Sequence, residues 1–155
     1  MQPADPLLLR LEIDALHAEF AYLIDRGDSD KVADLFTEDG VYGRSTGERS
    51  VGRAAIRESY RRRSAHGVRT ARHIFTNLRL EPLSERLIRG SVILTLFAQD
   101  GSPPLPADPM LVADYDDVYE QCADGRWRYR ERIITWVFTR QGASSPLALG
   151  AATKA

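Results

Sequence analysis

The sequence predicts an α+β fold, a cone in which a curved antiparallel sheet wraps a long N-terminal helix, with three helices in all. The prediction depends on a change of period. Apolar residues recur at three- and four-residue steps up to about residue 65 and alternate at two-residue steps from about residue 69. Helices followed by long strands make a layered fold with helices on one sheet face. The 155 residues contain no linker or repeat, so we expect one domain over 1–155, with a core at about 6–140 and a tail at 141–155.

The three helices are predicted in the first part of the chain. The first runs from Pro6 to about Arg26, and its apolar face consists of Leu9, Ile13, Leu16, Phe20, Leu23 and Ile24. Pro6 suits a first helical turn, and Gly27 is a natural helix end. A short second helix carries Val32, Ala33, Leu35 and Phe36. A short strand at 41–44 precedes the third helix, which runs from Arg53 to about Ala65.

Four long strands are predicted at about 69–82, 86–99, 110–122 and 126–139, where β-branched and aromatic residues are frequent. Asp100-Gly101 and Asp124-Gly125 mark two hairpin turns between them. A curved sheet packed on a long helix leaves a pocket between the two layers, and pockets of this kind are common small-molecule sites.

His73 is the strongest candidate for chemistry. It lies near the start of strand 69–82, and two-residue alternation places Phe75 and Asn77 on the same face. An imidazole in an apolar pocket takes a proton near neutral pH when another group orients it. The candidate for that group is Asp25, in the last turn of the first helix, where the helix dipole disfavours a carboxylate. The alternative is a buried pair that only ties the helix to the sheet.

Composition argues against several classes of partner. The formal net charge of −1 argues against nucleic acid, because phosphate binding needs a basic excess. One cysteine, Cys122, excludes an internal disulfide and a multi-cysteine metal site. His17 is expected to be exposed or to pack on the first helix, and neither it nor His66 is expected to reach His73. We therefore expect no metal and no other cofactor.

The sequence also predicts where the protein resides. No apolar run approaches the roughly 18 residues of a membrane span, and no signal-peptide pattern is present. We therefore expect a cytoplasmic protein with no membrane partner.

The order of elements resembles the nuclear transport factor 2-like, or cystatin-like, fold, and several motifs resemble its SnoaL-like family. Residues 22–40 resemble the family's opening, in which an aspartate ends the first helix and a Leu-Phe…Asp element follows. Arg72-His73-Ile-Phe-Thr-Asn77 resembles the strand that carries the family histidine. Gly52-Arg-Ala-Ala-Ile56 and Asp124-Gly-Arg-Trp127 resemble the opening of the third helix and the last hairpin. The resemblance extends from the first helix through residue 139.

Family members with an Asp–His pair include scytalone dehydratase and γ-hexachlorocyclohexane dehydrochlorinase. The resemblance implies that His73 removes a proton and Asp25 orients it, in a cofactor-independent lyase that expels water or another leaving group. Isomerase or cyclase chemistry on the same fold is an alternative. A non-catalytic alternative is a small-molecule-binding protein or an assembly subunit like the β subunit of ring-hydroxylating dioxygenases. The fold also implies a homodimer or homotrimer.

Aromatic side chains are expected to line the pocket. We favour Phe20, Tyr22, Phe75 and Trp136 for its wall, with Asn77 as a polar contact. Tyr22 lies one turn before Asp25 and is a candidate hydrogen-bond donor. Such a lining predicts a small, hydrophobic, cyclic partner molecule with few polar groups.

Overall fold

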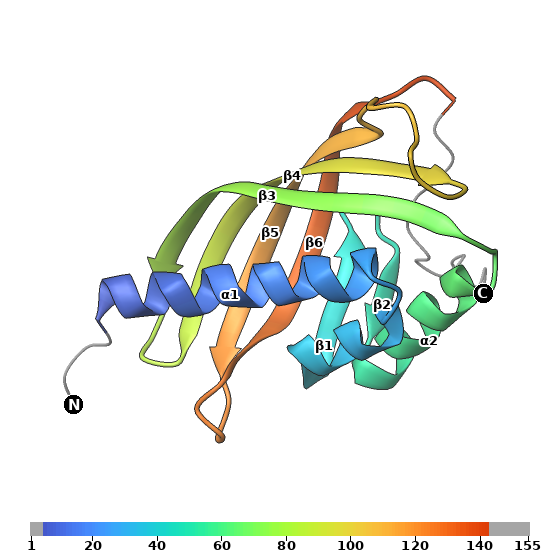
Figure 1. Ribbon diagram of the computed structural model, residues 1–155. Helices are drawn as coiled ribbons and strands as arrows, with labels where there is room; N and C mark the ends of the chain where they lie inside the picture. The colour runs from blue at the N-terminus through green and yellow to red at the C-terminus, as the bar shows by residue number, and fades with distance from the viewer. Residues whose placement is uncertain (1–4, 143–155) are drawn as a thin grey trace.

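The computed structural model describes residues 5–142, which form three helices and six strands (Figure 1). The helices are α1 (Pro6–Asp25), the 3-10 helix η1 (Ser29–Leu35) and α2 (Arg53–Ser64). The strands are β1 (Phe36–Arg44), β2 (Arg49–Val51), β3 (Arg69–Pro82), β4 (Leu87–Asp100), β5 (Leu111–Gln121) and β6 (Trp127–Thr139). The ends of α1, α2 and the four long strands agree with the prediction to about one residue. Most of the predicted tail, 143–155, lies outside the described residues.

Two details at the start of the sheet were predicted wrongly. The second helix ends at Leu35, and Phe36 already belongs to β1, which begins before the strand expected at 41–44. The physical reason is packing: Phe36 pairs with Tyr129 of β6, and the two ring centroids lie 5.2 Å apart. The short strand β2, which pairs with β1, was not expected from the sequence.

The strands form one curved sheet in the order β2-β1-β6-β5-β4-β3. The four long strands pair antiparallel with one another, as predicted. β1 runs parallel to β6, so the whole sheet is mixed and not purely antiparallel. α1 lies across the concave face of the sheet, and η1 and α2 pack together beside β1 (Figure 1). The predicted α+β cone is therefore confirmed.

Local features fix both ends of α1. The Asp5 carboxylate accepts a hydrogen bond from the Leu7 amide at 2.9 Å, and Pro6 occupies the first turn. After the helix, Gly27 has φ +93, and the Asp28 amide donates to the Leu23 carbonyl at 2.9 Å. The buried face of α1 consists of Leu9, Ile13, Leu16, His17, Phe20 and Leu23. These contacts leave the end of α1 beside β3.

Two bulges decide which side chains of the long strands point into the cone. In β3 the register shifts between Thr76 and Arg79, so Leu78 becomes the buried residue. In β6 the partner of Val118 is Glu131 and the partner of Tyr119 is Tyr129, so Arg130 is the extra residue. The second bulge turns Arg132 inward, where it is 0% exposed.

β3 is an edge strand, and side chains of α1 cover part of its free edge. Arg10 Nη1 donates to the Leu78 carbonyl at 3.1 Å, and the His73 amide donates to Asp25 Oδ2 at 3.0 Å. Such contacts satisfy edge groups that another strand could otherwise bind. They also hold α1 alongside β3, which brings Asp25 to His73.

Candidate active site

Asp25 and His73 come together as the sequence predicted. His73 Nδ1 lies 2.7 Å from Asp25 Oδ1, and both side chains are 8% exposed. The second carboxylate oxygen, Oδ2, accepts a hydrogen bond from the His73 backbone amide. Two contacts to one residue fix the carboxylate and, through it, the plane of the imidazole.

The contact also selects one tautomer of His73. An ionised carboxylate can only accept hydrogen bonds, so Nδ1 carries the proton that Asp25 receives. Nε2 of the neutral ring then carries the free lone pair. Within residues 5–142, His73 Nε2 makes no hydrogen bond. The arrangement has the geometry of an oriented general base.

Phe20, Phe75 and Trp136 lie inside the cone. Phe20 is completely buried, whereas Phe75 and Trp136 are half-buried at the margin of the core. The Phe75 ring centroid lies 6.5 Å from the His73 ring and 6.1 Å from the Phe20 ring. Phe75 is therefore the aromatic neighbour of His73, with Phe20 packed next to it, whereas the Trp136 ring packs on Arg44, whose guanidinium carbon lies 4.1 Å from its centroid.

Tyr22 and Asn77 do not lie where the sequence pattern placed them. Tyr22 is 58% exposed on the outer face of α1, with the Arg26 guanidinium 5.8 Å from its ring centroid. Asn77 is exposed and has φ 58, a left-handed conformation that asparagine tolerates better than most residues. The expectation that Asn77 shares the face of His73 is therefore wrong, because the bulge in β3 interrupts the alternation.

A second polar centre, which sequence reasoning missed, lies deeper in the cone around His17 and Arg132. Both residues are buried, at 3% and 0% exposed. Arg132 donates to both oxygens of Asp117, through Nε and Nη2, each at 2.9 Å. Tyr119 donates to Asp117 Oδ2 at 2.8 Å, and its hydroxyl lies 2.9 Å from His17 Nε2. The expectation that His17 is exposed or merely a packing residue is wrong.

The directions of these hydrogen bonds are determined by the chemistry of the groups. Since Tyr119 gives its proton to Asp117, its oxygen accepts from His17 Nε2–H. His17 Nδ1 is therefore an acceptor, and Arg132 Nη2 lies 2.9 Å from it. Burial, and then the charge of Arg132, lower the pKa of His17 to about 2. His17 is neutral in the folded protein.

The ionised pair in this centre is Asp117 with Arg132. Burial raises the pKa of Asp117, while the charge and hydrogen bonds of Arg132 oppose that shift. Arg132 keeps its charge, and its guanidinium carbon lies 4.1 Å from the Tyr115 ring centroid and 4.2 Å from that of Tyr129. Cation–π contacts of this kind stabilise a desolvated guanidinium.

Phe75 connects the two polar centres. Its ring centroid lies 6.5 Å from the ring of His73, 5.0 Å from the ring of His17 and 5.1 Å from the guanidinium carbon of Arg132. The candidate base and the buried arginine therefore both lie near the same aromatic ring.

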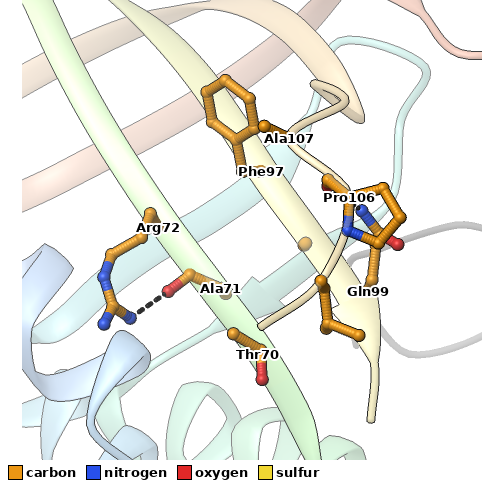
Figure 2. Close-up of a pocket in the computed structure, with 9 residues that line it drawn as sticks. Thr70, Ala71, Arg72, Phe97, Gln99, Pro106 and Ala107 are labelled. Carbon is orange, nitrogen blue, oxygen red and sulfur yellow. Dashed lines mark hydrogen bonds between the residues drawn. The ribbon is translucent and has the colours of Figure 1, made fainter. Parts of the chain in front are cut away.

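A groove of about 190 Å³ lies between β3, β4 and the loop at 105–107 (Figure 2). Arg72 is one of its lining residues and donates to the Ala71 carbonyl at 2.6 Å. The lining is Thr70, Ala71, Arg72, Phe97, Ala98, Gln99, Leu105, Pro106 and Ala107. His73, Asp25 and the other residues of α1 do not line this groove, so it is not the pocket expected between the first helix and the sheet.

Within the described part of the chain, no three His, Cys, Asp or Glu side chains are arranged to hold a metal ion. Among the helices of residues 5–142, none is long and apolar enough to cross a membrane.

A curved sheet around a long helix, with an Asp–His pair at the helix end, defines the class of protein. The model of the SnoaL-like domain family matches residues 5–133, and the chain belongs to that family. The resemblance proposed from the sequence is therefore confirmed. No curated protein sequence is similar enough to count as a match.

Solved structures share the fold at low sequence identity. A putative scytalone dehydratase from Novosphingobium aromaticivorans has a TM-score of 0.77 at 19% identity, with 96% of each chain covered. LinA has a TM-score of 0.70 at 20% identity, over 88% of this chain and 92% of LinA. A protein from Catenulispora acidiphila in complex with S-DNPA has a TM-score of 0.73 at 21% identity, over 84% of this chain and 94% of that protein.

Proposed function

We propose that the protein is a cofactor-independent lyase that acts on a small, hydrophobic, cyclic molecule. His73 is the general base and Asp25 is the residue that orients it. The similar putative scytalone dehydratase supports this class of reaction, and the Catenulispora acidiphila complex supports a small-molecule ligand within this fold. Phe20, Phe75 and Trp136 supply the apolar surface that such a ligand needs.

The proposed reaction is an elimination. His73 Nε2 takes a proton from a ligand carbon, and the C–H electron pair forms a carbon–carbon double bond. The leaving group departs from the neighbouring carbon with its bonding pair. When that group is a hydroxyl, the imidazolium returns the proton to it and water is released. Asp25 holds Nδ1–H and faces the imidazolium while the proton is on Nε2.

One observation carries the proposal: the 2.7 Å contact between His73 Nδ1 and Asp25 Oδ1 leaves Nε2 as the free nitrogen of a ring fixed beside Phe75. General-base catalysis by such a group is worth about 10²–10⁴-fold in rate.

The test uses a panel of cyclic alcohols whose dehydration forms a conjugated product that absorbs in the ultraviolet. We expect turnover by the parent protein and loss of at least about 10²-fold in His73→Asn and Asp25→Asn. His66→Asn is the matched control, because His66 is exposed at the end of α2. Equal rates in the parent and the His73 variant remove His73 as the base.

Two alternatives remain as second candidates. An isomerase or cyclase uses the same proton removal but returns a product of unchanged composition, which mass spectrometry distinguishes from loss of water. A non-catalytic binding or assembly protein is favoured by the second contact of Asp25, to the His73 amide, because that bond ties α1 to β3 whether or not chemistry occurs. Ligand binding without turnover across the panel supports that candidate.

We also expect a cytoplasmic homodimer or homotrimer. Ile74 and Phe138, on β3 and β6, are 46% and 67% exposed, which gives the sheet exposed apolar side chains that a second copy can cover. Light scattering of the full chain in solution measures the oligomeric state.

A further inference from the structure

Two arginines lie near each other where α2 ends and β3 begins (Figure 1). Arg63 is half-buried in the last turn of α2, and Arg69 is the first residue of β3, with a side chain that is 21% exposed. Burial, and then the charge of Arg69, lower the pKa of Arg63. Arginine nevertheless stays charged in proteins. Two partly desolvated positive charges are therefore held together, and an anion between them would relieve their repulsion.

The carboxylates of the chain leave this pair of arginines with a surplus of positive charge. Within residues 5–142, the Arg63 side chain makes no hydrogen bond and no ion pair. Arg69 Nη1 lies 3.3 Å from Asp100 Oδ1, but the Asp100 side chain is 86% exposed, so water weakens that pair. Residues 1–4 and 143–155 contain no aspartate or glutamate that could add a second carboxylate.

One edge of the Arg69 guanidinium is not used by any carboxylate. Its Nε is buried without a hydrogen-bond partner, and its Nη2 donates only to the Met110 sulfur, at 3.2 Å. A thioether is a weak acceptor on a flexible side chain, so an oxygen can replace it. Arg132 shows what the same edge binds when an acid is present, because its Nε and Nη2 each donate to one oxygen of Asp117 at 2.9 Å.

A third donor without a partner lies beside Arg63. Tyr60 is three residues earlier on α2, so the two side chains project from the same side of the helix. The Tyr60 hydroxyl is buried and makes no hydrogen bond, and its ring stacks on Tyr42 with the centroids 5.9 Å apart. Native proteins rarely leave such groups unsatisfied. Unsatisfied donors and an aromatic surface therefore occur together at this end of α2.

The dipole of α2 explains only part of this arrangement. Arginines in the last turn of a helix are stabilised by the partial negative charge there, and this applies equally to Arg61, Arg62 and Arg63. Arg61 and Arg62 are exposed, whereas Arg63 lies against Arg69. The dipole does not explain why a second arginine lies beside Arg63, or why the Nε of that arginine has no acceptor.

We propose that Arg63 and Arg69 form a binding site for the carboxylate group of a ligand, at the surface where the end of α2 meets the start of β3. Both side chains are partly exposed, so a carboxylate reaches them from solvent and needs no internal cavity. Arg69 lies on the same face of β3 as His73, four residues or about 13 Å away along the strand. The inference rests on the proposed function in one respect, that this ligand also reaches His73. It adds the substrate class, a cyclic molecule whose carboxylate is distant from the reacting carbon.

The test is ligand binding to the full chain, measured by calorimetry with two probes of one skeleton, 4-phenylbutyrate and its neutral amide, 4-phenylbutanamide. Because the site is open to water, which weakens ion pairs, we expect the parent protein to bind the acid about ten-fold tighter than the amide. The preference should decrease as the salt concentration rises from about 0.05 M to about 0.5 M, since salt screens partly exposed charges.

Matched variants locate the site. Arg63→Gln and Arg69→Gln each remove one positive charge and keep a polar side chain, and we expect each to lose most of the preference for the acid. Arg62→Gln is the matched control, because Arg62 is exposed in the same turn of α2. His73→Asn should also keep the preference, since the carboxylate site does not include the base.

Equal affinities of the parent for acid and amide, or no measurable binding of the acid at millimolar concentration, overturn the site. A preference that survives in both Arg63→Gln and Arg69→Gln, or that Arg62→Gln removes as completely, belongs to other residues and overturns the proposal as well. A preference for the acid without turnover of cyclic alcohols supports the carboxylate site and contradicts the lyase. Turnover of cyclic alcohols without a preference for the acid supports the lyase and overturns the carboxylate site.

Discussion

Asp25 binds His73 twice, once at the ring through Oδ1 at 2.7 Å and once at the backbone amide through Oδ2 at 3.0 Å. The same carboxylate therefore orients a candidate base and closes part of the free edge of β3. One side chain therefore makes both a structural hydrogen bond, to the backbone of β3, and a candidate catalytic hydrogen bond, to the imidazole. Stability and activity measurements can separate the two roles.

The double contact predicts unequal costs for the two partners. Asp25→Ala leaves both the ring nitrogen and the edge amide of His73 without an acceptor, whereas His73→Ala retains the amide contact. Since hydrogen bonds to charged groups are worth about 1.5–3 kcal/mol, we expect Asp25→Ala to lower the free energy of unfolding by at least that amount, and by more than His73→Ala. Urea denaturation measures both. A smaller loss of stability in Asp25→Ala than in His73→Ala contradicts a structural role for the hydrogen bond between Asp25 and the His73 amide.

His17 predicts a pH dependence of stability. Its pKa is lowered to about 2 in the folded protein, by burial and then by Arg132, from 6.5. Below pH 6.5 the unfolded chain therefore binds a proton that the folded protein does not. The free energy of unfolding falls as the pH decreases through this range, by up to about 1.4 kcal/mol per pH unit.

The measurement is urea denaturation between about pH 6.5 and pH 5, above the range in which most carboxylates titrate. We expect His17→Gln to have a shallower dependence than the parent, whatever its absolute stability. His66→Gln, at an exposed position, should keep the dependence of the parent. Identical slopes in the parent and the His17 variant contradict a neutral, buried His17.

Phe20 and Tyr22 form a matched pair on opposite faces of α1. Phe20 is 0% exposed and packs on Phe75 and Arg132, so Phe20→Ala should cost about 3–5 kcal/mol of stability. Tyr22 is 58% exposed, and Tyr22→Ala should change stability by no more than about 0.5 kcal/mol. Thermal unfolding compares the two. A large cost for Tyr22→Ala places its ring in the core.

The backbone conformation of Asn77 predicts an unusual order of stability among its variants. Its φ of 58 is available to glycine without strain but is poor for a β-branched residue. We expect Asn77→Gly to be nearly neutral and Asn77→Val to cost about 1–2 kcal/mol, although valine is the better strand former. If valine is the more stable of the two, then residue 77 is not in the left-handed conformation.

Much of this architecture follows from sequence patterns, because the changes of period at the helix–strand boundary are strong and the turn residues are clear. The Asp25–His73 contact was also predictable, from a helix-end carboxylate that the helix dipole disfavours and a histidine on the facing strand. Tyr22 was misplaced because it lies off the apolar stripe that Ile13, Leu16 and Phe20 define on α1.

The bulges explain the rest of what the sequence could not predict. Strict alternation from Trp127 places Arg132 on the outer face with Arg128 and Arg130, and only the extra residue at the bulge turns it inward. Alternation likewise placed Asn77 inside. His17 did carry a signal, since it lies four residues after the buried Ile13 and three before Phe20. Because histidine is polar, His17 was not counted among the residues of the buried helix face.

The most direct test of the account is exchange of deuterium into a cyclic ketone, followed by NMR in D₂O. This measurement detects proton removal by His73 and does not require the leaving group to be known. We expect the parent protein to accelerate exchange at the carbon next to the carbonyl, and His73→Asn to lose that acceleration while it still binds the ketone. Exchange that proceeds equally in the two proteins would contradict the assignment of His73 as the base.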